Sequence, residues 1–158
     1  MKKVKVSFDT WIQLLGMLGV LGGLVFVGLE MRQSQRIAMA GQQMERTALL
    51  IEANSVFTEA GLDWQSIAFL DQPELADTYP SGIAGGRNNY HQALFNYEND
   101  YFQFSQGLMP IEVWEAKKEA LSFFCNQCRY REILNIRKAF FPDGLVKVID
   151  SLQDNCAE

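Results

Sequence analysis

A run of twenty residues without a formal charge, from Thr10 to Leu29, constrains this chain more than any other feature. Gln13 is its one strongly polar side chain. A helix of this length measures about 30 Å at 1.5 Å per residue, which matches the hydrocarbon core of a bilayer. The alternatives are a buried core helix and a signal peptide, whose apolar region is usually shorter, about 7–15 residues. The sequence therefore predicts a transmembrane helix over residues 10–29, preceded by a flank of residues 1–9.

The glycines in this run indicate a surface for helix association. Residues 16–28 contain five glycines, although glycine weakens a helix in water by about 1 kcal/mol relative to alanine. In lipid the helix is enforced, and small residues let two helices approach closely. Gly16, Gly19 and Gly23 share one face, Gly19 and Gly23 form a GxxxG pair, and Gln13 lies one turn before Gly16. We expect these four residues to bind a second copy of the chain or another membrane protein.

The positive charges that flank the span are nearly balanced. Positive residues accumulate on the cytoplasmic side of a membrane, and the tight lysine cluster before the span favours a cytoplasmic N-terminus. The three cysteines point the other way, since an odd count is typical of free thiols in a reducing compartment. We expect a membrane protein whose soluble domain is cytoplasmic. The flanking charges are Lys2, Lys3 and Lys5 before the span and Arg32, Arg36 and Arg46 after it.

The helix is expected to continue beyond the span. No proline follows for forty residues, and Gly41 is the one helix breaker before Gly61. One helix is therefore predicted from Thr10 to Phe57, with residues 30–60 forming a stalk that packs on the bundle or between copies. Its stripe of apolar and small residues recurs every three or four positions, at Ile37, Ala40, Met44, Ala48 and Ile51.

Residues 61–158 predict an all-α bundle of five or six helices, because no period-two strand pattern appears. The strongest pattern is an aromatic helix from Asn88 to Leu108, which Gly107 ends. Residues 80–86, rich in glycine, are expected to form a loop. The remaining expectations are a short helix over Pro73–Tyr79, a helix that begins at Pro110, another around residues 129–141, and a last helix over Gly144–Leu152 capped by Asp143.

The chain resembles a family of small, uncharacterised bacterial membrane proteins with one N-terminal span and an all-helical domain. The resemblance rests on "RQSQ" after the span, "DQPELA", the aromatic stretch "FNYENDYFQFSQGL", "IEVWEAKKEAL" and "FFPDGLVKVID". These motifs cover nearly the whole chain, but each is loose and mostly structural. The resemblance implies a cytoplasmic domain and supplies no catalytic residue. The lysine cluster before the span departs from the family's pattern.

Candidate chemistry is sparse. Cys125 and Cys128 form a CxxC pair, and they could form a disulfide that leaves Cys156 free. They could also hold half of a zinc site, but a structural site needs four ligands, and only Cys156 and the lone His91 could complete it. We favour buried or peripheral thiols and expect no metal and no cofactor.

Glu98 lies between aromatic residues of the predicted helix, where burial raises the pKa of a carboxyl group and can make it an acid or base. A buried salt bridge to an arginine such as Arg129 or Arg131 is the more common arrangement. A net charge of −5 argues against a nucleic-acid partner.

These features predict a non-enzymatic, membrane-anchored module that assembles with itself or with another membrane protein. One alternative is a homo-oligomeric pore in which Gln13 forms a ring. The other is a thiol-based or metal-based sensor, or an enzyme, that uses Cys125, Cys128 and Glu98.

Overall fold

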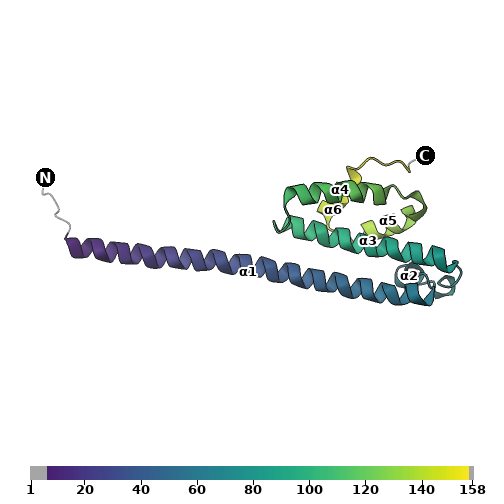
Figure 1. Ribbon diagram of the computed structural model, residues 1–158, viewed down its shortest axis with the longest axis horizontal. Coiled ribbons are helices and arrows are strands. Elements are labelled where there is room, and N and C mark those ends of the chain that lie inside the picture. The colour runs from purple at the N-terminus through teal and green to yellow at the C-terminus, as the bar shows by residue number, and fades with distance from the viewer. Residues whose placement is uncertain (1–6, 157–158) are drawn as a thin grey trace. The chain divides into compact units, whose positions relative to one another are not determined.

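The chain is all-helical in a computed structural model that describes residues 7–156 (Figure 1). No strand occurs among these residues, which confirms the predicted all-α class. The α-helices are α1 (Phe8–Ala60), α2 (Trp64–Ala68), α3 (Ser81–Ser105), α4 (Ile111–Cys125), α5 (Arg131–Lys138) and α6 (Asp143–Asp150), with two short 3₁₀ helices, η1 (Pro73–Leu75) and η2 (Cys128–Tyr130).

The first helix is unbroken over 53 residues, which confirms the predicted continuation past the apolar run. At 1.5 Å per residue it is about 80 Å long. The chain divides into two compact units, Met1–Met39 and Ala40–Glu158. Their boundary falls inside α1 and within the predicted stalk of residues 30–60.

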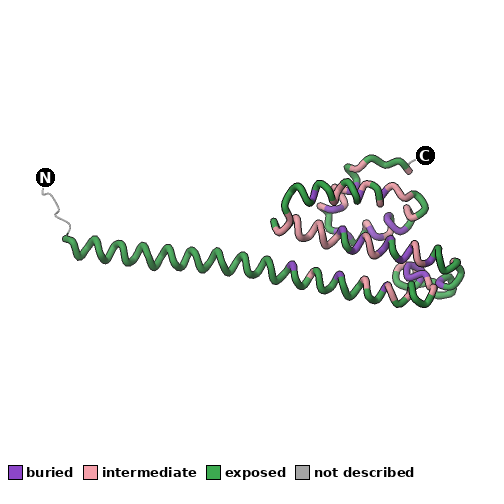
Figure 2. The backbone as a smooth tube through the Cα atoms, viewed as in Figure 1, coloured by how far each residue is buried: buried purple, intermediate pink, exposed green. Residues whose placement is uncertain are grey.

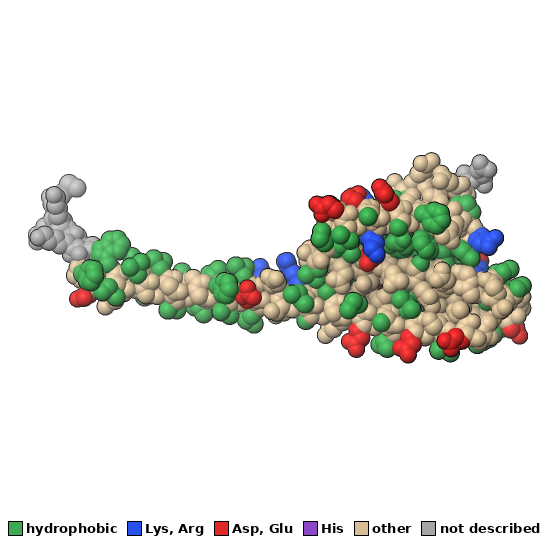
Figure 3. Space-filling model, in the orientation of Figure 1, with side chains coloured by type: hydrophobic (Ala, Val, Ile, Leu, Met, Phe, Trp, Pro, Cys, Tyr) green, Lys and Arg blue, Asp and Glu red, His purple; other side chains and the backbone are tan. Residues whose placement is uncertain are grey.

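The N-terminal unit contains the apolar part of α1. Every described residue from Ser7 to Met39 is exposed (Figure 2), and hydrophobic side chains are distributed along it (Figure 3). A window of 18 residues in α1 has a mean hydropathy of 2.2 and none of it is buried. By length and composition, this helix is long and apolar enough to cross a membrane. The lysine cluster of residues 2–5, used above to argue orientation, lies outside the described residues.

The second unit is a helical bundle whose core lies between α3, α4, α5 and α6. Helices α3 and α4 form an antiparallel pair (Figure 1). Near their connecting turn, Phe104 stacks on Trp114 with ring centroids 4.9 Å apart. Six apolar or aromatic side chains of the core are almost completely buried: Tyr90, Leu94, Leu121, Ile133, Leu134 and Leu145.

The last third of α1 packs in this bundle through small and polar residues. Its buried positions are Ala40, Thr47 and Asn54, spaced seven residues apart. The side-chain amide of Gln103 donates to the Ala40 carbonyl oxygen at 3.2 Å, and that of Gln92 donates to the Ser55 hydroxyl at 3.0 Å. This part of the predicted stalk thus belongs to the bundle.

The prediction of a loop over residues 80–86 is wrong, because α3 begins at Ser81. Pro80 lies at the N-cap with an extended backbone, so its missing N–H costs the helix nothing. Gly86 is needed for packing rather than for a turn, since a β-carbon there would lie 2.4 Å from the Tyr130 hydroxyl oxygen. By sequence alone, the glycines of residues 80–86 suggest a loop, because glycine weakens a helix.

Three smaller expectations have mixed outcomes. Gly107 does end α3, with a positive φ of 70°. The helix predicted over Pro73–Tyr79 is shorter, ending at Leu75. Asp143 is the first residue of α6 rather than its cap, since Pro142 occupies the N-cap position.

Gly144, at the second position of α6, generates a test of this packing. A β-carbon there would lie 1.7 Å from the Tyr101 hydroxyl oxygen and 2.7 Å from the adjoining ring carbon. We expect Gly144→Ala to lower the free energy of unfolding by about 1–3 kcal/mol, measured by chemical denaturation of the full chain in detergent. The matched control is Gly82→Ala in α3, where the space is open; it should be neutral or stabilise by up to about 1 kcal/mol. Equal effects of the two changes would contradict the close contact.

Candidate functional site

The predicted association face lies on the exposed part of α1. At 100° per residue, Gln13, Gly16, Gly19 and Gly23 lie within an arc of about 120°. No atom comes within 4 Å of a β-carbon built on any of these three glycines, so the backbone is accessible there. Gln13 and Gly16 line a shallow hollow on the helix, and Gly19 and Gly23 do not; the lining residues are Gln13, Gly16, Met17, Val20, Leu21 and Leu24.

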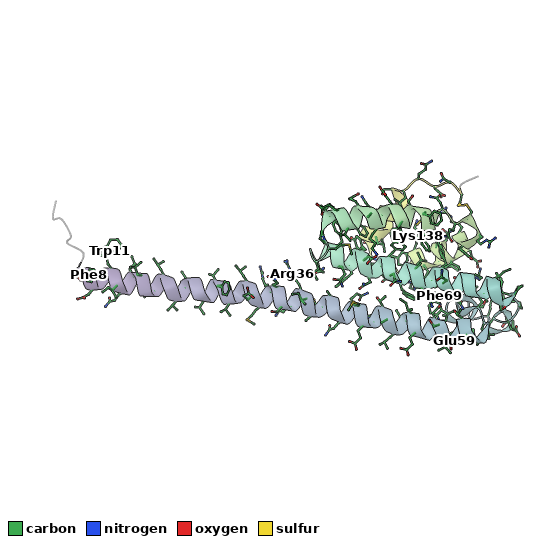
Figure 4. All side chains as sticks on the ribbon, viewed as in Figure 1. Phe8, Trp11, Arg36, Glu59, Phe69 and Lys138 are labelled. Atoms are coloured by element: carbon green, nitrogen blue, oxygen red, sulfur yellow. A yellow bond between two sulfur atoms is a disulfide. The ribbon has the colours of Figure 1, made fainter. Side chains whose placement is uncertain are left out.

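Aromatic side chains mark the start of the apolar segment. Phe8 and Trp11 project from the first turns of α1, well before Arg36 (Figure 4). Amphipathic aromatic rings are enriched at the headgroup level of a bilayer. The placement of Trp11 therefore matches one end of a membrane span, a signal that the sequence analysis did not use.

A buried polar corner joins the end of α1, α2 and α3. Asp63 caps α2, accepting hydrogen bonds from the Ser66 backbone N–H at 3.1 Å and from its hydroxyl at 2.6 Å. Its second oxygen accepts from Arg87 Nε at 2.8 Å, and both side chains are almost fully buried. Asn88 accepts from the Trp64 backbone N–H at 2.9 Å. Both carboxylate oxygens of Asp63 thus have partners, and this corner fixes how α2 meets α3.

The expected salt bridge of Glu98 forms, but with a different arginine. Arg137 of α5 donates to Glu98 at 3.2 Å, whereas Arg129 and Arg131, the partners suggested above, do not contact it. The Arg137 guanidinium lies 4.1 Å from the Phe95 ring centroid and close to the rings of Phe69 and Phe141. Burial raises the pKa of Glu98, while the Arg137 charge opposes that rise. The arrangement is an ion pair in an aromatic cage.

His91 is fully buried, and neither ring nitrogen has a hydrogen-bond partner. Its ring stacks on Phe69, with centroids 5.4 Å apart, and meets the edge of Trp64 at 4.8 Å. Burial lowers the pKa of His91 to about 3, and the charges of Arg137 and Arg87 contribute in the same direction. The imidazole is therefore neutral in the folded chain and packs as an aromatic ring.

This histidine predicts a pH dependence of stability. Between pH 6.5, where an unfolded histidine titrates, and the folded pKa of about 3, the unfolded chain binds a proton that the folded chain does not. The free energy of unfolding should therefore fall as pH falls, by up to about 1.4 kcal/mol per pH unit below 6.5. We expect His91→Gln to remove this component of the slope in denaturation curves measured from pH 7 to 4.5. Glu98 contributes with the opposite sign in both the unmodified protein and the variant, so its effect cancels when the two are compared. Equal slopes of the free energy of unfolding against pH would contradict the buried neutral imidazole.

The cysteines differ from both sequence expectations. Cys128 forms a disulfide with Cys156, and Cys125 is free and buried. The prediction of three free thiols is wrong, and so is a Cys125–Cys128 pair. Cys125 ends α4 and packs into the core, whereas Cys128 lies beyond a turn and is exposed.

Asn126 explains why Cys156 reaches Cys128. Its side-chain amide donates to the Gln153 carbonyl oxygen at 2.9 Å, and its side-chain oxygen accepts from the Asn155 backbone N–H at 2.7 Å. These two bonds hold the segment before Cys156 against the end of α4. The sequence offered no signal for them, since an asparagine after a helix is usually a local cap.

Among residues 7–156, no group of three or more histidine, cysteine, aspartate or glutamate side chains is placed to hold a metal ion. Comparison of the chain with protein families, with curated proteins and with solved structures finds no match. The family resemblance described above therefore stays a prediction.

Proposed function

We propose that this chain is a non-enzymatic, membrane-anchored module that associates with a second copy of itself through the face formed by Gln13, Gly16, Gly19 and Gly23. The observation that carries the proposal is the N-terminal unit: a helix of membrane-spanning length whose apolar side chains are exposed.

Insertion in a bilayer accounts for this exposure. Each large apolar side chain left in water forgoes roughly 1.5–3 kcal/mol of burial free energy, and lipid supplies the missing apolar environment for all of them. A cleaved signal sequence is the competing explanation. The unbroken course of α1 from the apolar run to Ala60 supports an anchor that stays attached to the bundle.

Self-association accounts for the glycines and for Gln13. Without side chains at three positions of one face, two helices can approach until their backbones touch. A primary amide surrounded by hydrocarbon gains from a hydrogen-bonding partner, worth roughly 0.6–2 kcal/mol. A parallel second copy places its own Gln13 at the same depth, where each amide can donate to and accept from the other.

A glycine substitution tests the association face. Gly19→Ile fills the proposed contact, and we expect association of the full chain in mild detergent to weaken about tenfold or more, measured by analytical ultracentrifugation. Gly28→Ile is the matched control, because nine residues place Gly28 on the opposite side of the helix from Gly19; it should associate like the unmodified protein. A monomeric unmodified protein, or equal loss in both variants, would refute the proposal. Channel conductance in planar bilayers that Gln13→Leu abolishes would favour a pore instead.

We further propose that the bundle faces the oxidising side of a bacterial inner membrane. The expectation of a cytoplasmic domain rested partly on free thiols, and the Cys128–Cys156 disulfide removes that argument, since disulfides persist mainly outside the cytosol. The lysine cluster of residues 2–5 then agrees with the disulfide, because it favours a cytoplasmic N-terminus.

Reporter fusions to the C-terminus test this orientation. We expect alkaline phosphatase, which is active only in the periplasm, to be active when fused there, and green fluorescent protein exported by the same route to be dark. The same fusions to a truncated chain ending before the span serve as controls for expression. Bright fluorescence together with an inactive phosphatase would place the bundle in the cytoplasm.

A further inference from the structure

The two sulfur atoms of the disulfide lie beside the turn of backbone that follows Cys125. The Sγ atoms of Cys128 and Cys156 lie 3.5 and 3.6 Å from the carbonyl oxygen of Asn126, the residue that follows Cys125. The free Cys125 thiol lines a small cavity of about 110 Å³ that Gln153 and other residues of the C-terminal segment also line. A free thiol therefore lies beneath the segment that the disulfide holds in place.

We propose that Cys125 is the exchange partner of the Cys128–Cys156 disulfide, and that residues 153–156 form a releasable latch over this cavity. The Cys125 thiolate attacks the Sγ atom of Cys128, so that a Cys125–Cys128 bond forms and the Cys128–Cys156 bond breaks. The electron pair leaves on the Cys156 sulfur, which takes up the proton that Cys125 released. One disulfide and one proton change places, and no outside oxidant or reductant is consumed.

Attack on Cys128 rather than on Cys156 follows from chain geometry. Cys125 is the last residue of α4, and Cys128 is the first residue of η2, with Asn126 and Gln127 between them. This is the CxxC spacing in which thioredoxin-type pairs form a disulfide. The leaving sulfur, on Cys156, belongs to the segment that follows α6 and lies outside the described helices.

The latch is otherwise held by contacts that are individually weak. These are the two hydrogen bonds to Asn126 and an ion pair between Arg131 and Asp154, both partly exposed, and a pair of this kind contributes about 0–1 kcal/mol. When the disulfide moves, Arg131 loses its carboxylate partner and the cavity beside Cys125 opens. The exchange thus converts a closed surface into an open, positively charged one.

Burial keeps the attacking thiol latent. Burial raises the pKa of Cys125 to about 11, which the charges of Arg131 and Lys138 partly offset and that of Asp154 reinforces. The thiolate is the reactive form, so the closed state exchanges slowly at neutral pH and persists in the resting protein.

Alkylation trapping tests the exchange. The full chain, purified in detergent without reductant, is incubated with N-ethylmaleimide, denatured at acid pH and digested with trypsin. Cleavage after Lys118, Arg129 and Lys147 puts Cys125 and Cys128 in one peptide, 119–129, and Cys156 in another, 148–158. We expect alkylated 148–158 to accumulate together with a 119–129 peptide that is two hydrogens lighter.

Each other result overturns the proposal. One such result is alkylation of Cys125 while the two peptides stay cross-linked, and another is alkylation of all three cysteines. A third is that the folded protein takes up no label, although the denatured protein takes up one label per chain. The matched control is Cys125→Ser, with Cys125→Ala as a second variant should serine destabilise the core. Either should slow labelling of Cys156 at least tenfold, and unchanged labelling would rule out Cys125 as the attacker.

A second variant tests the geometry alone. Cys156→Ser leaves Cys125 and Cys128 as free thiols, and we expect diamide to convert them to the disulfide within peptide 119–129. Failure to form that bond in the folded chain, with cross-linked dimers as the product instead, would show that the two sulfurs cannot meet.

Discussion

The structure depends on the environment of the N-terminal part of α1, where every described residue up to Met39 is exposed and most side chains between Thr10 and Leu29 are apolar. Backbone hydrogen bonding is satisfied inside the helix, so the segment is stable in hydrocarbon, where irregular structure is not. The same property explains why glycine is tolerated there. The bundle has its own core and its own polar contacts.

The bundle uses buried polar groups to fix how its helices meet. The Asp63–Arg87 pair and the caged Arg137–Glu98 pair each join different helices, and removal of one partner from a buried pair typically costs about 3–5 kcal/mol. The seam between α1 and α3 is also polar, since it buries Asn54 with neither side-chain atom hydrogen-bonded. In some other proteins, buried polar groups select one alignment of the helices over others.

Sequence patterns predicted those helices and helix ends that do not depend on contacts between residues far apart in the chain. The apolar run, the course of α1, the aromatic helix and its end at Gly107 follow from periodicity and local backbone preference. The start of α3 does not follow from these patterns, because glycines at 82, 85 and 86 suggest a loop. The close approach of Tyr130 to Gly86, which explains one of them, is visible only in the structure. Helix α2 was missed because it is only five residues long and depends on its Asp63 cap. The partner of Glu98 and the pairing of the cysteines depend on tertiary contacts between distant residues, which one sequence does not encode in any local pattern.

The Cys128–Cys156 disulfide closes a segment that contains both eight-residue helices, α5 and α6. Helices this short are marginal alone in water, so the covalent loop restricts the alternatives open to them. Arg137, the counter-ion of Glu98, is carried on α5. Loosening α5 would withdraw that cation and strengthen the hold of Glu98 on its proton. Reduction of this disulfide would thereby favour protonation of a carboxyl group on another helix.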